Sequence, residues 1–270
     1  MSGVGPTIAA ARAQGRAVLI GYLPVGFPDV ATSVAAMTAM VHAGVDIVEV
    51  GVPYSDPLMD GPVIQHAVDA ALRAGARPLD AINAAGAVAD AGAPALVMTY
   101  WNIVERYGVD AFSRDLAQAG GAGLITPDLI PDEAATWLAA SDEHRLDRVF
   151  LVAPSSTDAR LRSTAAACRG FVYAASTMGV TGVRTSVGDS ARTLVERTHS
   201  VTDLPVCVGL GVSDGAQAAE VAAFADGVIV GSALVRCLAD ASTPAQGVAA
   251  LARLAAELAD GVRDGSRQRV

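Results

Sequence analysis

The chain has 270 residues, of which 52% are hydrophobic, and its formal net charge is −9. This length suits one large domain or two small ones, and so apolar a chain can bury a sizeable core. The acidic charge argues against nucleic acids and anionic membranes as partners, and no apolar stretch reaches the ~18 residues expected of a membrane-spanning helix.

Eight short apolar runs recur along the chain, and each is followed by an amphipathic segment. This alternation predicts β-strands separated by α-helices, which form a parallel sheet with right-handed crossovers. Eight such units in about 250 residues favour a closed (β/α)8 TIM barrel over an open, doubly wound sheet of six or seven strands. The expected strands are Ala17–Leu23, Asp46–Gly51, Ala95–Tyr100, Ala122–Thr126, Arg148–Ala153, Gly170–Ala175, Pro205–Gly209 and Gly227–Gly231.

Two expected helices are additional to this repeat. Thr7–Gln14 precedes the first strand, and Pro78–Ala91 lies between the second and third strands. No low-complexity linker interrupts the chain, so we expect one TIM-barrel domain, residues 1–270, with an additional N-terminal helix. The other expected helices are one that begins near Pro62 and Ala31–Ala43, Val109–Ala119, Asp132–Ala140, Ala159–Cys168, Ser190–His199, Asp214–Phe224 and Ala245–Leu258.

A glutamate stands inside the second expected strand. Glu49 interrupts the apolar run VDIVEV, where a free charge is costly. Strand faces alternate, and near the C-terminal end of a barrel strand the mouth is the polar side. Apolar walls there raise a carboxyl pKa and suit it to general acid–base catalysis. The alternative is a structural glutamate paired with an arginine of a neighbouring strand, and the strand pattern alone weighs the two about evenly.

Two aspartates follow in the loop YSDPLMDGP. Loop aspartates often form Asx-turns or cap helices, and for Asp56, which precedes a proline, the turn is favoured. Asp60 precedes Gly61–Pro62, so it either caps the next helix or adds a second carboxylate to the mouth.

The last two strands end in glycines, in the motifs VGLGVS and VIVGSALV. Glycines let backbone N–H groups approach an anion, and a helix that starts at Ser232 points its positive end there. Loops after strands seven and eight are a common phosphate site in this fold. The presence of both glycine motifs at these positions therefore favours a phosphate site over glycines that serve only tight turns. The glycine-rich loop after strand six, STMGVTGVRTSVGD, is either a lid over the ligand or an ordinary surface loop.

The composition excludes several kinds of chemistry. All 19 basic residues are arginine, so the chain cannot form a lysine Schiff base or hold pyridoxal phosphate covalently. The four histidines lie in or at the ends of expected helices rather than at the mouth, so we expect no metal. The three cysteines show no disulfide or zinc spacing, and the amino terminus lacks a signal-peptide pattern, which favours a cytoplasmic protein.

These motifs resemble the α subunit of tryptophan synthase over nearly the whole chain. The segment VEVGVPYSDPLMDGPVIQ is similar to the family's signature around its paired acids, and MTYWNIVERYG, LITPDLI, VAPSSTDARL and VIVGSALV follow in order. The resemblance implies a lyase of tryptophan biosynthesis that cleaves indole-3-glycerol phosphate to indole and D-glyceraldehyde 3-phosphate by a retro-aldol reaction. It also implies no cofactor in this chain and an allosteric α2β2 complex, in which a pyridoxal-phosphate-dependent β subunit receives indole through a tunnel.

The resemblance implies a role for individual residues. Glu49 matches the acid–base glutamate, and Asp60 matches the second carboxylate, which hydrogen-bonds the indole N–H. Thr181 matches a lid threonine that touches this second acid. The other substrate contacts are expected at Tyr22, Ile64, Leu124 and Tyr173, the phosphate contacts at Gly182, Gly211, Gly231 and Ser232, and the β subunit near Pro53, Asp56 and Asn102. Met59 and the segment Ala175–Met178 depart from the family's pattern, which leaves lid closure open but not the reaction class.

Other readings compete with this one. An indoleglycerol phosphate synthase would need a catalytic lysine, and a ribulose-phosphate epimerase would need metal-binding histidines. A different class is an interaction module that mainly activates the β subunit, and this role can coexist with lyase activity.

Overall fold

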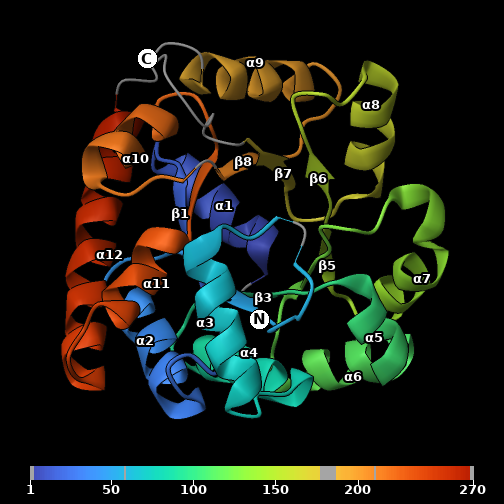
Figure 1. Ribbon diagram of the computed structural model, residues 1–270. Helices are drawn as coiled ribbons and strands as arrows, with labels where there is room; N and C mark the ends of the chain where they lie inside the picture. Colours follow the sequence, from blue (N-terminus) through green and yellow to red (C-terminus); the bar gives the residue numbers. More distant parts are fainter. Residues whose placement is uncertain (1–2, 58, 177–186, 210, 268–270) are drawn as a thin grey trace.

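Parallel strands form the wall of a barrel in the computed structural model, which describes residues 3–57, 59–176, 187–209 and 211–267. Within these residues nine strands follow the order β5-β4-β3-β2-β1-β9-β8-β7-β6 (Figure 1). They are β1 (Val18–Pro24), β2 (Ile47–Gly51), β3 (Ala95–Met98), β4 (Gly123–Ile125), β5 (Asp147–Val149), β6 (Leu151–Val152), β7 (Val172–Ala175), β8 (Val206–Gly209) and β9 (Gly227–Val230).

The two ends of this order, β5 and β6, are parts of one predicted strand. Only Phe150 separates them; β5 pairs with β4, and β6 pairs with β7. The chain itself therefore closes the ring at this point, and the wall has eight strand positions. The predicted (β/α)8 TIM barrel is confirmed, and every expected strand overlaps an observed one.

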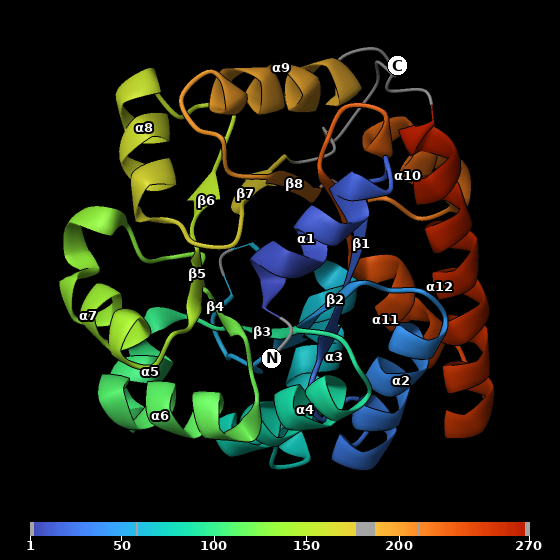
Figure 2. The same ribbon diagram turned by 180° about the vertical axis from the view of Figure 1, so that it is seen from behind.

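Helices surround the barrel, and most of them cover the outside of the wall (Figures 1 and 2). They are α2 (Val30–His42), α3 (Pro62–Arg73), α4 (Pro78–Asp90), α5 (Trp101–Tyr107), α6 (Val109–Ala119), α7 (Ala135–Glu143), α8 (Asp158–Ala167), α9 (Val187–His199), α10 (Gly215–Ala222), α11 (Ser232–Ala239) and α12 (Pro244–Ser266). The helices differ from expectation in three ways. Helix α5 was not predicted, the 3-10 helix η1 (Pro131–Glu133) precedes α7, and α12 continues beyond Leu258. In the described part of the chain, no helix is both long and apolar enough to cross a membrane.

Side-chain caps at the first turns explain where several helices begin. The carboxylate of Asp29 accepts a hydrogen bond from the Thr32 amide, and Asp214 caps α10 in the same way through Gln217. The hydroxyls of Thr157 and Thr243 cap α8 and α12. Such caps satisfy amide groups that have no carbonyl partner within the helix.

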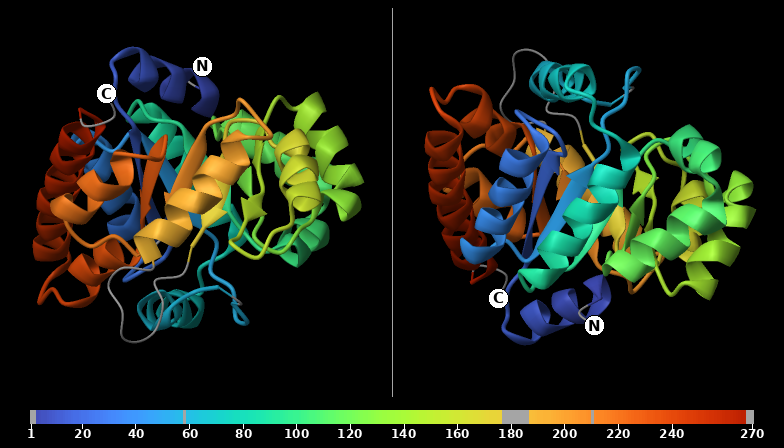
Figure 3. Two further views of the ribbon diagram at one scale, coloured as in Figure 1. Left: turned by 90° about the horizontal axis from the view of Figure 1, so that it is seen from above. Right: turned by 90° about the horizontal axis from the view of Figure 1, so that it is seen from below.

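The additional N-terminal helix, α1 (Val4–Ala13), closes the end of the barrel at which the strands begin. Its buried residues Val4, Ile8 and Ala11 pack onto apolar side chains from the strands, including Ile20 and Ile47. Figure 3 shows α1 at one end of the barrel and α3 at the other. Because α1 covers the end at which the strands begin, we expect ligands to enter from the end that carries α3.

Glycines allow α10 and α12 to cross at very short range. A Cβ atom at Gly261 would lie 2.0 Å from the Gly215 carbonyl oxygen, and one at Gly265 would lie 2.0 Å from the Ala219 carbonyl oxygen. Both α12 glycines are buried. This packing gives α12 a tertiary reason to continue past Leu258, although glycine is a poor helix former.

We expect Gly261→Ala to lower the free energy of unfolding by ~1–3 kcal/mol, because the methyl group overpacks the contact between α10 and α12. The better helix propensity of alanine, up to ~1 kcal/mol, opposes this loss only in part. Gly5→Ala in α1 is the matched control, since a Cβ atom at that position would meet no described atom within 4 Å, and it should be neutral or stabilising. Urea denaturation of both variants tests the contact, and equal stabilities would contradict it.

Candidate active site

The interior of the barrel consists of a closed apolar layer and a polar layer above it. Ile20, Ile47 and Phe171 belong to the apolar cluster sealed by α1. Two residues further along the same strands stand Tyr22, Glu49 and Tyr173, which therefore face the same interior. Tyr22 and Glu49 are register partners on β1 and β2. The strand pattern thus brings one carboxyl and two phenol rings together near the strand C-terminal ends.

Glu49 is completely buried and unpaired. Its exposed fraction is 0%, and neither carboxyl oxygen has a hydrogen-bond partner among the described residues. Burial raises the pKa of Glu49 from 4.5 to about 8. The arginine-paired alternative is therefore wrong within the described part of the chain, and at neutral pH this carboxyl keeps its proton.

Glycines next to the two tyrosines leave room for their rings. A Cβ atom at Gly51 would lie 2.5 Å from the Tyr22 hydroxyl, and one at Gly231 would lie 3.2 Å from the Tyr22 ring. A Cβ atom at Gly209 would lie 2.6 Å from the Tyr173 hydroxyl. A side chain at Gly51 or Gly209 would therefore displace a ring that lines the mouth, and one at Gly231 would crowd the Tyr22 ring.

Asp60 is the second carboxylate at this mouth. It is half-buried, and burial raises its pKa. Burial is the main cause of the raised pKa values of Tyr22 and Tyr173, and the charges of both Asp60 and Glu49 raise them further. Both acids therefore lie close enough to the two rings to act on them electrostatically. The helix-capping alternative for Asp60 is wrong, because the N-cap of α3 is Gly61 and no side chain caps this helix.

The predicted phosphate residues lie after the adjacent strands β8 and β9. Helix α11 starts at Ser232, as expected, and Gly231 is its N-cap. Gly211 has a φ of +74°, a conformation that favours glycine. The first amides of α11 and the loop after β8 therefore lie beside each other at the mouth. Thr181 and Gly182, from the loop after β7, fall outside the described residues.

Comparisons with known proteins agree with this geometry. The family model for the tryptophan synthase alpha chain matches residues 8–263. The chain belongs to this family. The alpha chain of Salinispora arenicola is 65% identical over 97% of this chain and 98% of the relative, and that of Mycobacterium marinum is 64% identical over 97% and 95%. A structure of Mycobacterium tuberculosis tryptophan synthase has a TM-score of 0.90 at 63% identity, covering 96% of this chain and 98% of the other.

As a member of the α chain family, the protein is the lyase subunit of tryptophan synthase. It cleaves indole-3-glycerol phosphate and passes indole to the β subunit. More distant relatives keep the fold: the α subunit of Legionella pneumophila has a TM-score of 0.88 at 28% identity, and it covers 98% of this chain and 99% of the other.

Two predicted ring contacts differ in their placement. Ile64 lies in the first turn of α3, four residues after Asp60, and is half-buried. Leu124 is fully buried but packs in the layer between the strands and the helices, whereas its neighbour Ile125 lies inside the barrel. The choice of Leu124 was one residue out of register, because adjacent strand residues face opposite sides. The interior side chain of β4 is Ile125.

The residues expected near the β subunit lie on the loop after β2 and at the start of α5. Pro53 is buried after β2, Asp56 is exposed and accepts a hydrogen bond from Ser55 at 2.6 Å, and Asn102 is exposed in the first turn of α5. The Asn102 amide donates to the Tyr54 hydroxyl at 3.2 Å, which joins the two loops.

Sequence reasoning missed several side chains at this end of the barrel. Met98 follows Leu96 by two residues on β3 and packs on the interior cluster, so strand alternation would have identified it. Tyr54 and Tyr100 stack with a centroid separation of 4.6 Å. No local pattern predicts that stack, because it forms between loops 46 residues apart in the sequence.

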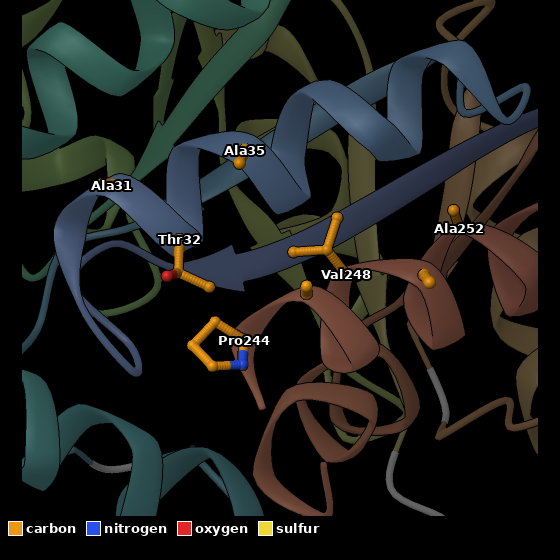
Figure 4. Close-up of a pocket in the computed structure, with 8 residues that line it drawn as sticks. Ala31, Thr32, Ala35, Pro244, Val248 and Ala252 are labelled. Atoms are coloured by element: carbon orange, nitrogen blue, oxygen red, sulfur yellow. The ribbon is translucent and has the colours of Figure 1, made fainter. Parts of the chain in front are cut away.

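A hollow in the outer surface lies between α2 and α12 and is separate from this mouth (Figure 4). Small and apolar residues line it, among them Ala35, Pro244 and Val248. None of the predicted site residues lines it, and we interpret it as an imperfection of packing between two outer helices. One surface group in the described chain, Asp110, Glu143 and His144, brings together possible metal ligands, but it also lies away from the mouth.

The raised pKa of Glu49 makes stability depend on pH. Near pH 4.5 and below, the carboxyl is protonated in both the folded and the unfolded chain. Between pH 4.5 and about 8 only the unfolded chain releases the proton, so the free energy of unfolding falls by ~1.4 kcal/mol per pH unit. Glu49→Gln removes this titration, and its stability relative to wild type should therefore increase across that interval and level off above it. Urea denaturation from pH 5 to 9 measures the difference, and a constant value would contradict an unpaired buried carboxyl.

Proposed function

We propose that Glu49 is the general acid and base of indole-3-glycerol phosphate cleavage and that Asp60 is its electrostatic partner. The observation that carries this proposal is a fully buried, unpaired carboxyl with a pKa of about 8 in the mouth of the barrel. Such a group holds a proton at neutral pH and can still release it, which is the requirement for proton transfer to a carbon atom.

In the proposed reaction the Glu49 carboxyl first gives its proton to C3 of the indole ring. The ring becomes a cationic indolenine, which can accept the electron pair of the bond to the glyceryl carbon. As that bond breaks, the resulting Glu49 carboxylate takes the proton of the glyceryl hydroxyl, and this carbon leaves as the aldehyde. One carboxyl thus serves both proton transfers and is regenerated.

Asp60 acts in this scheme through its charge. As an ionised carboxylate beside N1–H, it stabilises the positive charge that develops on the ring when C3 is protonated. Its partial exposure suits this role, because Asp60 loses less hydration than the fully buried Glu49. The two acids can therefore hold different protonation states at one pH, as acid–base catalysis by a pair of carboxyls requires.

The substrate is proposed to lie across the mouth, from the rings to α11. Its indole contacts Tyr22, Ile64 and Tyr173, and its phosphate lies at the start of α11. We assign the phosphate contacts to Gly211, Gly231 and Ser232 among the described residues and to Gly182 by resemblance alone. Thr181 is assigned, also by resemblance alone, as the lid residue that touches Asp60. Backbone amides at a helix start suit this role in a chain that has no lysine.

The assembly is proposed as an α2β2 complex in which pyridoxal phosphate belongs to the β subunit. Support comes from the family and from the exposed loops that carry Asp56 and Asn102 beside the mouth. We further propose that the whole chain folds as a single domain, and its cytoplasmic location stays a prediction. Activation of the β subunit is a second role of the same surface, and indole release with and without added β subunit separates the two roles.

We expect Glu49→Gln to fold normally and to lose indole-3-glycerol phosphate cleavage by at least ~10²-fold, the lower range for removal of a general acid–base group. The wild-type rate should also fall above about pH 8, where Glu49 loses the proton that it must donate. Glu220→Gln, an identical change at an exposed position on α10, is the control and should be fully active. Indole release gives the rates, and activity of Glu49→Gln within a few-fold of wild type would refute the assignment.

Ser232→Ala tests the phosphate site without adding bulk near Tyr22. We expect the KM for indole-3-glycerol phosphate and the Kd for glyceraldehyde 3-phosphate to rise about 10- to 150-fold, as for loss of one hydrogen bond to a charged group, while kcat changes little. Ser242→Ala, in the exposed turn after α11, is the matched control. Unchanged binding of glyceraldehyde 3-phosphate would place the phosphate elsewhere.

A further inference from the structure

The loop that carries Asp60 is held from outside the barrel by a chain of polar and aromatic contacts. The Met59 amide donates a hydrogen bond to the Tyr100 hydroxyl at 3.4 Å. The Tyr100 ring stacks on Tyr54, and the Asn102 side chain donates to the Tyr54 hydroxyl. These contacts lead from the exposed first turn of α5 to the residue directly before Asp60.

This chain of contacts joins segments that strand pairing alone does not fix. Tyr54 and Met59 belong to the loop between β2 and α3, in which Ser55 and Asp56 are exposed. Tyr100 follows β3, is 8% exposed, and precedes α5 directly. The Trp101 amide donates to the Asp128 carboxylate at 3.0 Å, which anchors the start of α5 to the loop after β4. The loop of Asp60 is thus attached to Tyr100, whose own position is fixed by β3 before it and by the hydrogen bond of Trp101 to Asp128 after it.

From this arrangement we propose that Tyr100 and Tyr54 are positioning residues for Asp60, and that Asn102 acts on Asp60 through them. The inference rests on the proposed role of Asp60. An offset aromatic stack fixes the relative placement of two rings and contributes beyond its buried area. The Tyr100 hydroxyl then fixes the backbone at Met59, and Asp60 follows at the next residue. The Met59 contact is long for a hydrogen bond, so its removal should loosen the loop rather than unfold it.

The mechanism gives this positioning a specific kinetic consequence. Asp60 is proposed to stabilise charge that exists only after C3 is protonated, so a misplaced Asp60 lowers kcat. Phosphate binding at α11 does not involve this loop, so the Kd for glyceraldehyde 3-phosphate should not change. A general loss of structure would alter both quantities, and this difference separates positioning from stability.

Tyr100→Phe is the central test, because it keeps the stacked ring and removes only the hydroxyl. We expect kcat to fall about three- to tenfold, the range for loss of one neutral hydrogen bond, with unchanged binding of glyceraldehyde 3-phosphate. Tyr107→Phe is the matched control: the Tyr107 hydroxyl donates to Asp115 at 2.7 Å on the outer helices, and its loss should leave kcat unchanged. Wild-type kcat in Tyr100→Phe, or an equal loss in Tyr107→Phe, would overturn the proposal.

A double-mutant cycle with Asp60→Asn shows whether Tyr100 acts through Asp60. In the Asp60→Asn background, measured in single turnovers of the full chain, Tyr100→Phe should have no further effect. An undiminished three- to tenfold loss in that background would overturn the proposal. If Asp60→Asn alone retains wild-type activity, the proposed function of Asp60 fails instead, and the two failures are thus distinguishable.

The outer half of the chain of contacts is tested by Asn102→Ala and Tyr54→Phe. Both remove the hydrogen bond between these side chains, so the two variants should lower kcat by a similar factor, smaller than that of Tyr100→Phe. The double variant should have a kcat no lower than that of either single variant. Additive losses would mean that the two residues act separately and would overturn the link through Tyr54. Thermal denaturation of each variant confirms that it is folded under the assay conditions.

Discussion

One costly arrangement underlies the proposed chemistry: the barrel encloses an ionisable carboxyl that has no partner among the described residues. Water cannot solvate Glu49, and no described residue donates a hydrogen bond to it. The folded protein therefore favours the neutral acid, which raises the pKa to about 8. A surface glutamate would be ionised at neutral pH and unable to protonate a carbon atom. The destabilisation caused by burial and the catalytic ability of Glu49 are the same physical effect.

The rest of the fold makes this arrangement tolerable by separating stability from chemistry. An apolar cluster fills the lower half of the barrel interior and is closed by α1, and the contact between α10 and α12 is close enough to require glycines. The mouth contains the features that reduce stability, namely the two acids, the strand-end glycines and the loops. A substitution in the mouth can therefore change catalysis without removing the contacts that hold the barrel together.

Most of the architecture could be predicted because its signals are local. Apolar runs and intervening amphipathic segments give the strands and most helices, and Glu49 is visible as a single charge in an apolar strand. The errors arise where local patterns are ambiguous. Leu124 and Ile125 are equally apolar, and only the register of β4 decides which faces inward. The stack of Tyr54 on Tyr100 depends on the closure of the barrel, so no sequence window contains it.

The two acids differ in how firmly the fold holds them. Glu49 lies on a strand inside a closed wall, so its environment is fixed by the whole barrel and is difficult to alter from outside. Asp60 lies on a loop whose support reaches the exposed Asn102. Under the proposed function, the proton donor is therefore fixed by the packed strands, whereas the position of its electrostatic partner depends on contacts that end at the exposed start of α5.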